Sequence, residues 1–375
     1  MNPLRKDFAR DEAVFAEATG AEPRDGNTYW HPVVITAARI DAEVERLASL
    51  PRPANGRREV LITHPLAPAH APGLAPGIQV KLSVLKPGEE TAPFRHNATE
   101  VNFCLAGEGE ALVGGKRIAH RRHDVWNHPS FTPYRHRNTG RDLLVRLTYS
   151  NVPLLQLLQV YLPEDCDSAE APAEAANERI AKPDPARTSP FGMVSIGTDG
   201  GQLMPYETLI NPVPAESKAL HFPWETVKAE LDKLVALGKE YVGRRLYMMY
   251  NPLTTRFNGI TPSFFATMTI RPGGIVDRPH RHVSAAINYY FKGSGYSSVG
   301  GHRYEWAAGD LMLSAPGWVV HNHASDADPV YELTVQDQPL HIYMESLLWQ
   351  EDLHHPPQLL GSRPGFNTNR ARLQG

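Results

Sequence analysis

The feature that most constrains this fold is an internal repeat. Four segments of the first half of the chain recur in the second half at a nearly constant offset of 186 or 187 residues. The paired segments are 40–50 with 227–237, 57–66 with 244–253, 94–109 with 280–295, and 146–154 with 332–340. A constant offset over four segments indicates a duplicated structural unit. The sequence therefore predicts two copies of one domain.

The pattern inside each copy favours short strands. Gly, Pro, Asn and Asp interrupt the apolar runs roughly every 8–12 residues, which is typical of a jelly roll or β-barrel. Apolar residues recur at helical spacing only at about 37–50 and 223–238, and the N-terminal segment is a weaker helical candidate. We therefore expect an all-β protein with two barrels and a few flanking helices.

The same pattern divides the chain into parts. The segment 164–190 is rich in Ala, Glu, Asp and Pro and predicts a linker. The expected parts are an N-terminal helical segment at 1–55, a first barrel at 56–163, the linker at 164–190, a helical connection at 191–243, a second barrel at 244–353 and a C-terminal tail at 354–375.

Composition argues against several classes of function. The formal net charge is −3, so no basic surface indicates nucleic-acid binding. No apolar run reaches the roughly 18 residues of a membrane span, and the charged N-terminus lacks the apolar core of a signal peptide. The chain has two cysteines, Cys104 and Cys166. We expect a cytoplasmic protein with reduced thiols.

The second copy carries two pairs of histidines at metal-ligand spacing. His280 and His282 are two residues apart, as are His321 and His323. Side chains two apart on a strand share one face, so each pair is expected to point into the barrel. Three neutral imidazoles on adjacent strands can bind a divalent metal and leave positions open. A lone histidine would favour an ordinary core or surface role, but two such pairs in one barrel favour a metal site.

The segment GGIVDRPHRH followed by GDLMLSAPGWVVH resembles the two motifs of the cupin family. The family's usual glutamate is absent, because Ala286 and Ile287 occupy its places. Three histidines without that glutamate resemble the two-barrel gentisate 1,2-dioxygenases and their salicylate- and hydroxynaphthoate-cleaving relatives, as do RRLYMMYNPL and SFFATMTIRPGG. The resemblance implies a non-haem Fe(II) dioxygenase that uses O2 to cleave a small hydroxylated aromatic compound. It also implies a homo-oligomer.

The resemblance implies roles for particular residues. His280, His282 and His321 would bind Fe(II), and His323 would be a hydrogen-bond donor or acid/base group near the substrate. Among the aromatic residues, Phe265 and Trp318 are candidates to wall a flat ring, although such residues also pack any barrel core.

One departure from the family concerns the substrate. The arginine that commonly follows the second motif histidine by six residues is replaced by Asn288. By strand parity, Asn288 and Tyr290 point toward the metal and are candidate catalytic residues. An asparagine cannot form the charge-assisted pair that arginine makes with a carboxylate, so the usual 2-hydroxybenzoate substrate is placed in doubt. Arg244 or Arg245 would compensate, or the two arginines are a solvated pair at the start of a strand; Arg278 is a weaker candidate.

The first copy departs differently. Phe94 stands at the place of His280, whereas His96, Glu100 and His136 fall at or near three ligand places. These three residues form either a second 2-His-1-carboxylate site or part of a decayed barrel whose polar residues satisfy one another. We favour decay because Phe94 is large and apolar.

Two other functions remain open from the sequence. An oxalate-decarboxylase-like cupin would use Mn(II), and its chemistry usually needs the motif glutamate, which Glu100 keeps available in the first barrel. A non-enzymatic two-barrel protein that binds a small molecule is the other alternative. The paired histidines of the second copy, His280 with His282 and His321 with His323, argue against a purely structural role.

Overall fold

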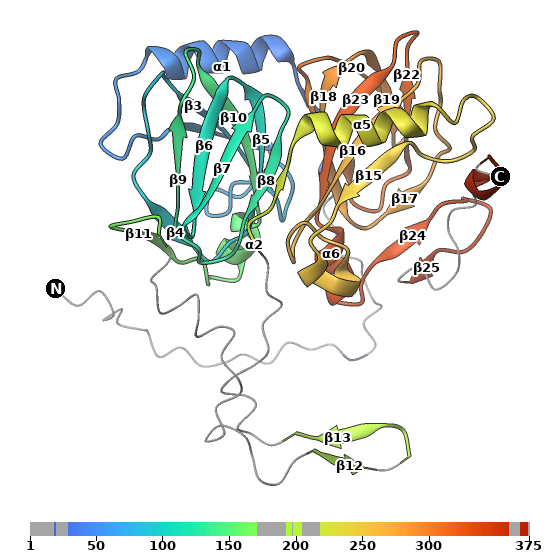
Figure 1. The fold of residues 1–375 in the computed structure, drawn as a ribbon. Helices are drawn as coiled ribbons and strands as arrows, with labels where there is room; N and C mark the ends of the chain where they lie inside the picture. Colours follow the sequence, from blue (N-terminus) through green and yellow to red (C-terminus); the bar gives the residue numbers. More distant parts are fainter. Residues whose placement is uncertain are drawn as a thin grey trace.

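The two copies of the repeated unit form two β-barrels that lie side by side (Figure 1). The structure is a computed structural model that describes residues 29–170, 193–196, 198–204, 218–359 and 368–373, together with Thr19. Antiparallel strands make up most of both halves, which confirms the predicted all-β class with two barrels.

The first barrel consists of two antiparallel sheets. The six-stranded sheet has the order β14 (His221–Phe222), β8 (Val125–His128), β5 (Glu100–Ala106), β10 (Leu144–Ser150), β3 (Gln79–Leu85) and β2 (Arg58–Ile62). The five-stranded sheet has the order β11 (Pro163–Asp165), β4 (Phe94–His96), β9 (Tyr134–Asn138), β6 (Glu108–Val113) and β7 (Lys116–Arg121).

The second barrel repeats the six-stranded sheet and divides its remaining strands into two smaller sheets. The six-stranded sheet has the order β1 (Val33–Ile35), β21 (Leu311–Pro316), β18 (Ala285–Lys292), β23 (Val330–Gln336), β16 (Phe265–Arg271) and β15 (Leu246–Met249). One three-stranded sheet contains β20 (His302–Ala307), β19 (Ser294–Val299) and β22 (His321–Ser325), and the other contains β17 (Arg281–His282), β24 (Leu348–Gln350) and β25 (Gln358–Leu359).

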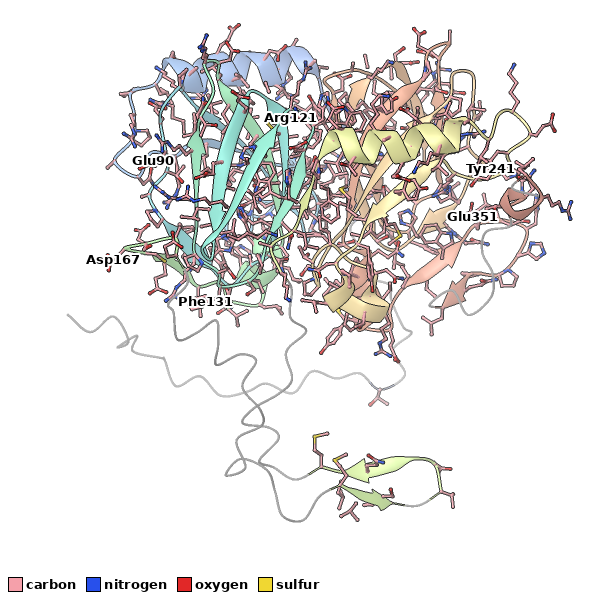
Figure 2. The ribbon with its side chains drawn as sticks, in the orientation of Figure 1. Glu90, Arg121, Phe131, Asp167, Tyr241 and Glu351 are labelled. Carbon is pink, nitrogen blue, oxygen red and sulfur yellow. The ribbon has the colours of Figure 1, made fainter. Side chains whose placement is uncertain are left out.

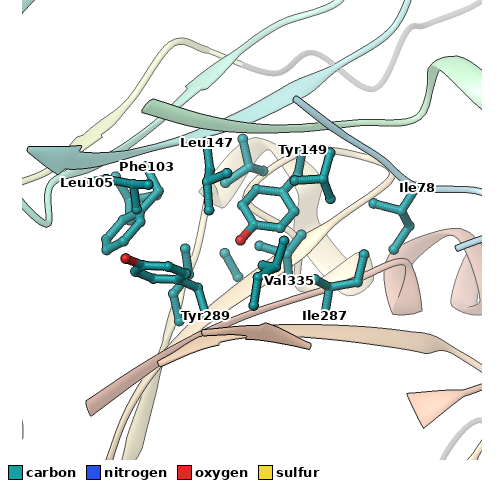
Figure 3. Close-up of a cluster of buried hydrophobic side chains, with 14 of the residues drawn as sticks. Ile78, Phe103, Leu105, Leu147, Tyr149, Ile287, Tyr289 and Val335 are labelled. Carbon is teal, nitrogen blue, oxygen red and sulfur yellow. The ribbon is translucent and has the colours of Figure 1, made fainter. Parts of the chain in front are cut away.

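The main apolar core lies between the two six-stranded sheets (Figure 3). Phe103 and Tyr149 project from the first barrel toward Ile287 and Tyr289 of the second. The rings of Phe103 and Tyr289 meet edge to face, with their centroids 5.6 Å apart. Because side chains alternate along a strand, the residues between these positions point the other way, into the two barrel interiors. The interiors are therefore free to carry polar side chains.

Each barrel is completed by a strand that precedes the other barrel in the sequence. Strand β1 precedes the first barrel, yet it pairs with β21 of the second. Strand β14 precedes the second barrel, yet it pairs with β8 of the first. These strands have three and two residues, too few to produce a recognisable alternation in the sequence.

The helices that follow these strands are held in the same reciprocal manner. Helix α1 (Ala37–Ser49) and helix α5 (Trp224–Val235) agree with the two predicted helices. The backbone N–H of Ala37 donates to Asp310 of the second barrel, and that of Trp224 donates to Asp124 of the first, both at 2.7 Å. A carboxylate is favourable there because the first N–H groups of a helix have no partner within the helix.

The remaining described elements are short. They are helices α2 (Val152–Leu157), α6 (Gln338–Tyr343) and α7 (Arg370–Leu373), the 3-10 helix η2 (Pro252–Phe257), and the hairpin of β12 (Val194–Ile196) and β13 (Gly201–Leu203). Residues 171–190 of the expected linker lie outside the described residues. No helix in the described part of the chain is long and apolar enough to cross a membrane.

Candidate metal and substrate site

Three histidines of the second barrel converge at one point in its interior. His282 lies on β17 and His321 begins β22, while His280 pairs its backbone with His321 through an isolated bridge. One nitrogen of each ring lies within 4.8 Å of the other two. Each residue is at most 3% exposed. The structure thus brings the three predicted ligands together.

Hydrogen bonds fix which nitrogen of each ring faces that point. The Nδ1 atoms of His280, His282 and His321 lie 3.0, 2.9 and 2.9 Å from the backbone oxygens of Arg278, Ser284 and Val319, respectively. A carbonyl oxygen only accepts, so each Nδ1 carries the proton. The three Nε2 atoms therefore carry the electron pairs that a metal-binding imidazole requires, and that of His280 accepts from Arg244 Nη2.

The environment keeps these rings neutral. Burial is the largest cause that lowers the pKa of each ring, and it brings the pKa of His321 to about 4. Arg244 lowers the pKa of His280 further, because its positive charge disfavours a second one nearby. Three neutral nitrogen donors fit a first-row divalent ion. The three imidazoles suit several divalent first-row metals, so the metal itself has to be inferred from the reaction.

The three histidines open into a cavity inside the barrel. Strands β16, β18, β22 and β23 supply most of its wall. Besides the three histidines, the predicted residues that line it are Arg244, Arg245, Phe265, Asn288 and His323. The structure thus brings most of the predicted site residues together.

Asn288 occupies the cavity wall in a fixed orientation. Its Nδ2 donates to Thr334 Oγ1 at 2.9 Å, and its Oδ1 accepts from Ser314 Oγ at 2.5 Å. The residue is 2% exposed, and strand parity directed it inward as expected. Its side chain contributes no charge to this part of the wall.

The two neighbouring arginines differ in their surroundings. Arg244 Nη2 lies 3.1 Å from His280 Nε2 and 3.6 Å from Glu351 Oε1. Arg245 donates to the backbone oxygen of Gly238 at 2.8 Å and lies over the ring of Tyr241. Tyr241 and Glu351 both lie on the side of the second barrel that faces away from the first (Figure 2). Arg244 is therefore the arginine next to the converging nitrogens.

Two predicted site residues are not among the residues that line this cavity in the described chain. Tyr290 is fully buried behind the wall, where its ring stacks on Trp306 at 3.8 Å. Trp318 lies under the guanidinium of Arg281, 4.4 Å from its ring centroid. Strand parity was right about the inward direction of Tyr290, but it does not say how deep along the barrel a side chain lies. Their predicted catalytic and substrate-binding roles remain predictions.

Several residues of the cavity were not found from the sequence. Trp349 packs on His282, with ring centroids 4.7 Å apart. Arg271 donates to both oxygens of Glu332 at 3.1 and 3.2 Å and to Asp277 at 3.1 Å. Burial would lower the pKa of Arg271, but the two carboxylates raise it. The sequence could have indicated Arg271 and Glu332, because their positions on β16 and β23 direct both side chains into the barrel.

The interior of the first barrel holds a different arrangement. Glu100 accepts from His128 Nδ1 at 2.7 Å and lies 3.2 Å from His96 Nε2 and 3.4 Å from the Tyr134 hydroxyl. Burial would raise the pKa of Glu100, but Lys81 and the hydrogen bonds from the two histidines hold it well below 4.5.

The histidines of this network also differ from those of the second barrel. His128 had no predicted role, yet its Nε2 accepts from Trp126 at 3.2 Å, so both of its nitrogens are engaged. Among the described residues, the ligand atoms of His280, His282 and His321 converge on a possible metal position, and His96, Glu100 and His136 do not form such a group. The arrangement favours the decayed-barrel hypothesis.

Comparisons with known proteins agree with this architecture. The family model described as "Cupin domain" matches twice, at residues 81–149 and 266–335. This chain contains two cupin domains. The two matches cover the central strands of the two barrels, and they confirm the resemblance on which the sequence interpretation relied.

Curated relatives of this chain are 1,2-dioxygenases by name. It is 26% identical over 70% of its length to a 5-aminosalicylate 1,2-dioxygenase of Comamonas sp., and it spans 66% of that relative, just under two thirds. It is 27% identical over 77% of its length to a 1-hydroxy-2-naphthoate 1,2-dioxygenase of Nocardioides sp. (strain KP7), of which it spans 71%.

A solved structure shares the bicupin fold over nearly the whole chain. The salicylate 1,2-dioxygenase of Pseudaminobacter salicylatoxidans superimposes with a TM-score of 0.69 and 16% identity, covering 92% of this chain and 93% of that one. At this identity the likeness concerns the fold. It confirms two barrels in this order and arrangement.

Proposed function

We propose that this bicupin is an Fe(II)-dependent dioxygenase that cleaves the ring of a small hydroxylated aromatic compound in its second barrel. The observation that carries the proposal is the set of three buried Nε2 atoms whose Nδ1 partners are backbone carbonyls. The names of the relatives, which are 1,2-dioxygenases of aminosalicylate, hydroxynaphthoate and gentisate, support the reaction class.

His280, His282 and His321 would hold the ion. Three neutral ligands leave the full charge of Fe(II) available to two anionic guests, whereas a carboxylate ligand would offset part of it. Bound Fe(II) would supply adjacent coordination positions for a phenolic oxygen and O2, together with a path for electrons between them. No carboxylate occupies the usual motif place in this barrel, since Ala286 and Ile287 stand there.

The other residues of the cavity would bind and orient the ring. Phe265 and Trp349 offer apolar faces beside the histidines. Arg244 is the cation nearest to the His280 ligand atom, so it would pair with an anionic group of the substrate. His323 would donate or accept a proton at an oxygen of the substrate.

The neutral wall at Asn288 bears on which aromatic compound fits. Its amide can donate one hydrogen bond to a ligand but offers no positive charge. A carboxylate on the substrate would therefore depend on Arg244. We expect gentisate itself to be a poor substrate.

Oxygen uptake by the iron-loaded chain tests the proposal. The panel contains hydroxybenzoates, aminophenols and hydroquinones, and the matched control is the His282→Ala variant loaded in the same way. We expect uptake with at least one aromatic compound that requires both iron and His282. Uptake with none of them, at a confirmed iron content near one per chain, would leave a non-enzymatic binding protein as the better hypothesis. Retention of zinc alone would argue against the metal assignment.

A Mn(II) enzyme of the oxalate-decarboxylase type is less well supported. It would rely on Glu100, whose oxygens already accept from His128 and lie beside His96 and Tyr134. Oxalate added to the same panel distinguishes it.

A further inference from the structure

The remaining histidine of the two predicted pairs, His323, has a hydrogen-bond partner of a different kind. His323 lies directly opposite Ser297 in the pairing of β22 with β19. Its Nδ1 is 2.8 Å from the Ser297 hydroxyl oxygen. The three converging histidines instead place a backbone carbonyl at Nδ1. His282 Nδ1 also lies 3.0 Å from the Ser284 hydroxyl, but that hydroxyl donates to Gln336 Oε1 and can only accept from the ring. His323 lines the cavity, so the ring edge that bears Nε2 is the one left for a ligand.

A second contact decides the direction of that hydrogen bond. The indole Nε1 of Trp306 lies 2.9 Å from the same Ser297 oxygen. An indole N–H can only donate, so the Ser297 oxygen is an acceptor toward Trp306. A hydroxyl has one proton to give. If His323 Nδ1 also donated to Ser297, the hydroxyl proton of Ser297 could be accepted by neither Trp306 nor His323.

Burial makes such a loss costly. Ser297 is fully buried and Trp306 is 3% exposed. Leaving a buried donor without a partner costs about 1–3 kcal/mol. The hydroxyl of the nearby Tyr290 has no hydrogen-bond partner within bonding geometry among the described residues, so it does not accept the Ser297 proton. The Ser297 proton is therefore directed to His323 Nδ1.

We propose that Ser297, held by Trp306, is a positioning residue that fixes His323 in the tautomer with its proton on Nε2. The cavity then meets a hydrogen-bond donor at His323, whereas His280, His282 and His321 present electron pairs. The group that bonds Nδ1 thus determines which histidines can bind a metal and which one donates a hydrogen bond. The proposal rests on the proposed function, in which the His323 N–H would donate to an anionic oxygen of the aromatic substrate.

The tautomer can be measured without any turnover. We suggest 15N NMR of the histidine side chains in the full-length chain loaded with diamagnetic Zn(II). The His323→Gln variant identifies the signal of His323. We expect a protonated Nε2 and an unprotonated Nδ1 in the wild type, and a mixture of tautomers in Ser297→Ala. A protonated Nδ1 in the wild type, or an unchanged spectrum in Ser297→Ala, would overturn the proposal.

Kinetics with a substrate found in the oxygen-uptake panel provide the second readout. We expect Ser297→Ala to lower kcat about 10- to 100-fold with little change in KM or metal content. Ser297→Thr, which keeps a hydroxyl, should restore most of kcat. Adding Ser297→Ala to His323→Gln should cause no further loss, because Ser297 acts through His323. A further loss of the same size would assign Ser297 a purely structural role.

The two readouts fail in different ways. If no aromatic compound is consumed, the proposed function fails, but the NMR experiment still tests the tautomer. If turnover is found and the tautomer is the opposite one, the proposed function stands and the role of Ser297 is refuted. Unfolding temperatures of the variants show whether either result reflects a damaged fold.

Discussion

Replacement of Arg271 by methionine should strongly destabilise the second barrel. Arg271 is 6% exposed and its guanidinium bonds both oxygens of Glu332, which is 3% exposed. Methionine fills much of the side-chain volume but removes the charge. Glu332 would then be a buried carboxylate without a cation, and Asp277 would lose its bond to the same guanidinium.

The expected cost follows from the burial of that carboxylate. Removing one partner of a buried ion pair costs about 3–5 kcal/mol, chiefly because the remaining charge is desolvated. Removing both charges is close to neutral when the replacements pack well. We therefore expect Arg271→Met to lower the free energy of unfolding by about 3–5 kcal/mol, and Arg271→Met with Glu332→Gln to recover most of it.

Urea denaturation of the metal-free chain measures the total effect, and hydrogen exchange of the β16 and β23 amides assigns it to the second barrel. The matched control is Arg303→Met, because the Arg303–Glu305 ion pair is exposed on the surface. We expect no measurable change for that variant. A change below about 1 kcal/mol for Arg271→Met, or no recovery in the double variant, would refute the reasoning.

Three further predictions concern the two barrels. His282→Ala should abolish iron binding measured by elemental analysis, whereas His96→Ala should leave the iron content near that of the wild type. Arg244→Gln should raise KM at least 10-fold for carboxylated substrates in the oxygen-uptake assay, and Arg245→Gln should leave KM nearly unchanged, since its guanidinium is held by Gly238. Glu100 has a lowered pKa in the folded state, so its stabilising effect is present above its ordinary value of 4.5 and is lost as the pH falls through the folded-state value. Glu100→Gln should therefore flatten the acid side of the stability profile in pH-dependent thermal unfolding.

The repeat and the strand parity predicted much of the fold and of the site. The two-residue spacing of the histidine pairs and strand parity placed His280, His282 and His321 on one interior surface, and the structure brings their nitrogens together. Parity also directed Asn288 inward correctly. These features are local, because a pleated strand determines the face on which each side chain lies.

Features that depend on pairing between distant segments could not be predicted in this way. Trp349 approaches His282 only because β24 pairs with β17. His128 lies in a stretch of the sequence with scattered histidines, and its role as a donor to Glu100 follows from the pairing of β8 with β5. Depth along the barrel, which separates Asn288 from Tyr290, is likewise a tertiary property.

The reciprocal placement of β1 and β14 bears on why a barrel without a convergent ligand set persists. A chain cut between its halves would leave each part with an unfilled sheet edge, and each would carry a strand that belongs elsewhere. The same cut would separate Asp310 from the first N–H of α1, and Asp124 from the first N–H of α5. Mutation can thus remove the ligands of the first barrel one by one, whereas deletion of that half would take the outermost strand of the other with it. Loss of either half would therefore disrupt the barrel that remains, whether or not the lost half carried a metal site.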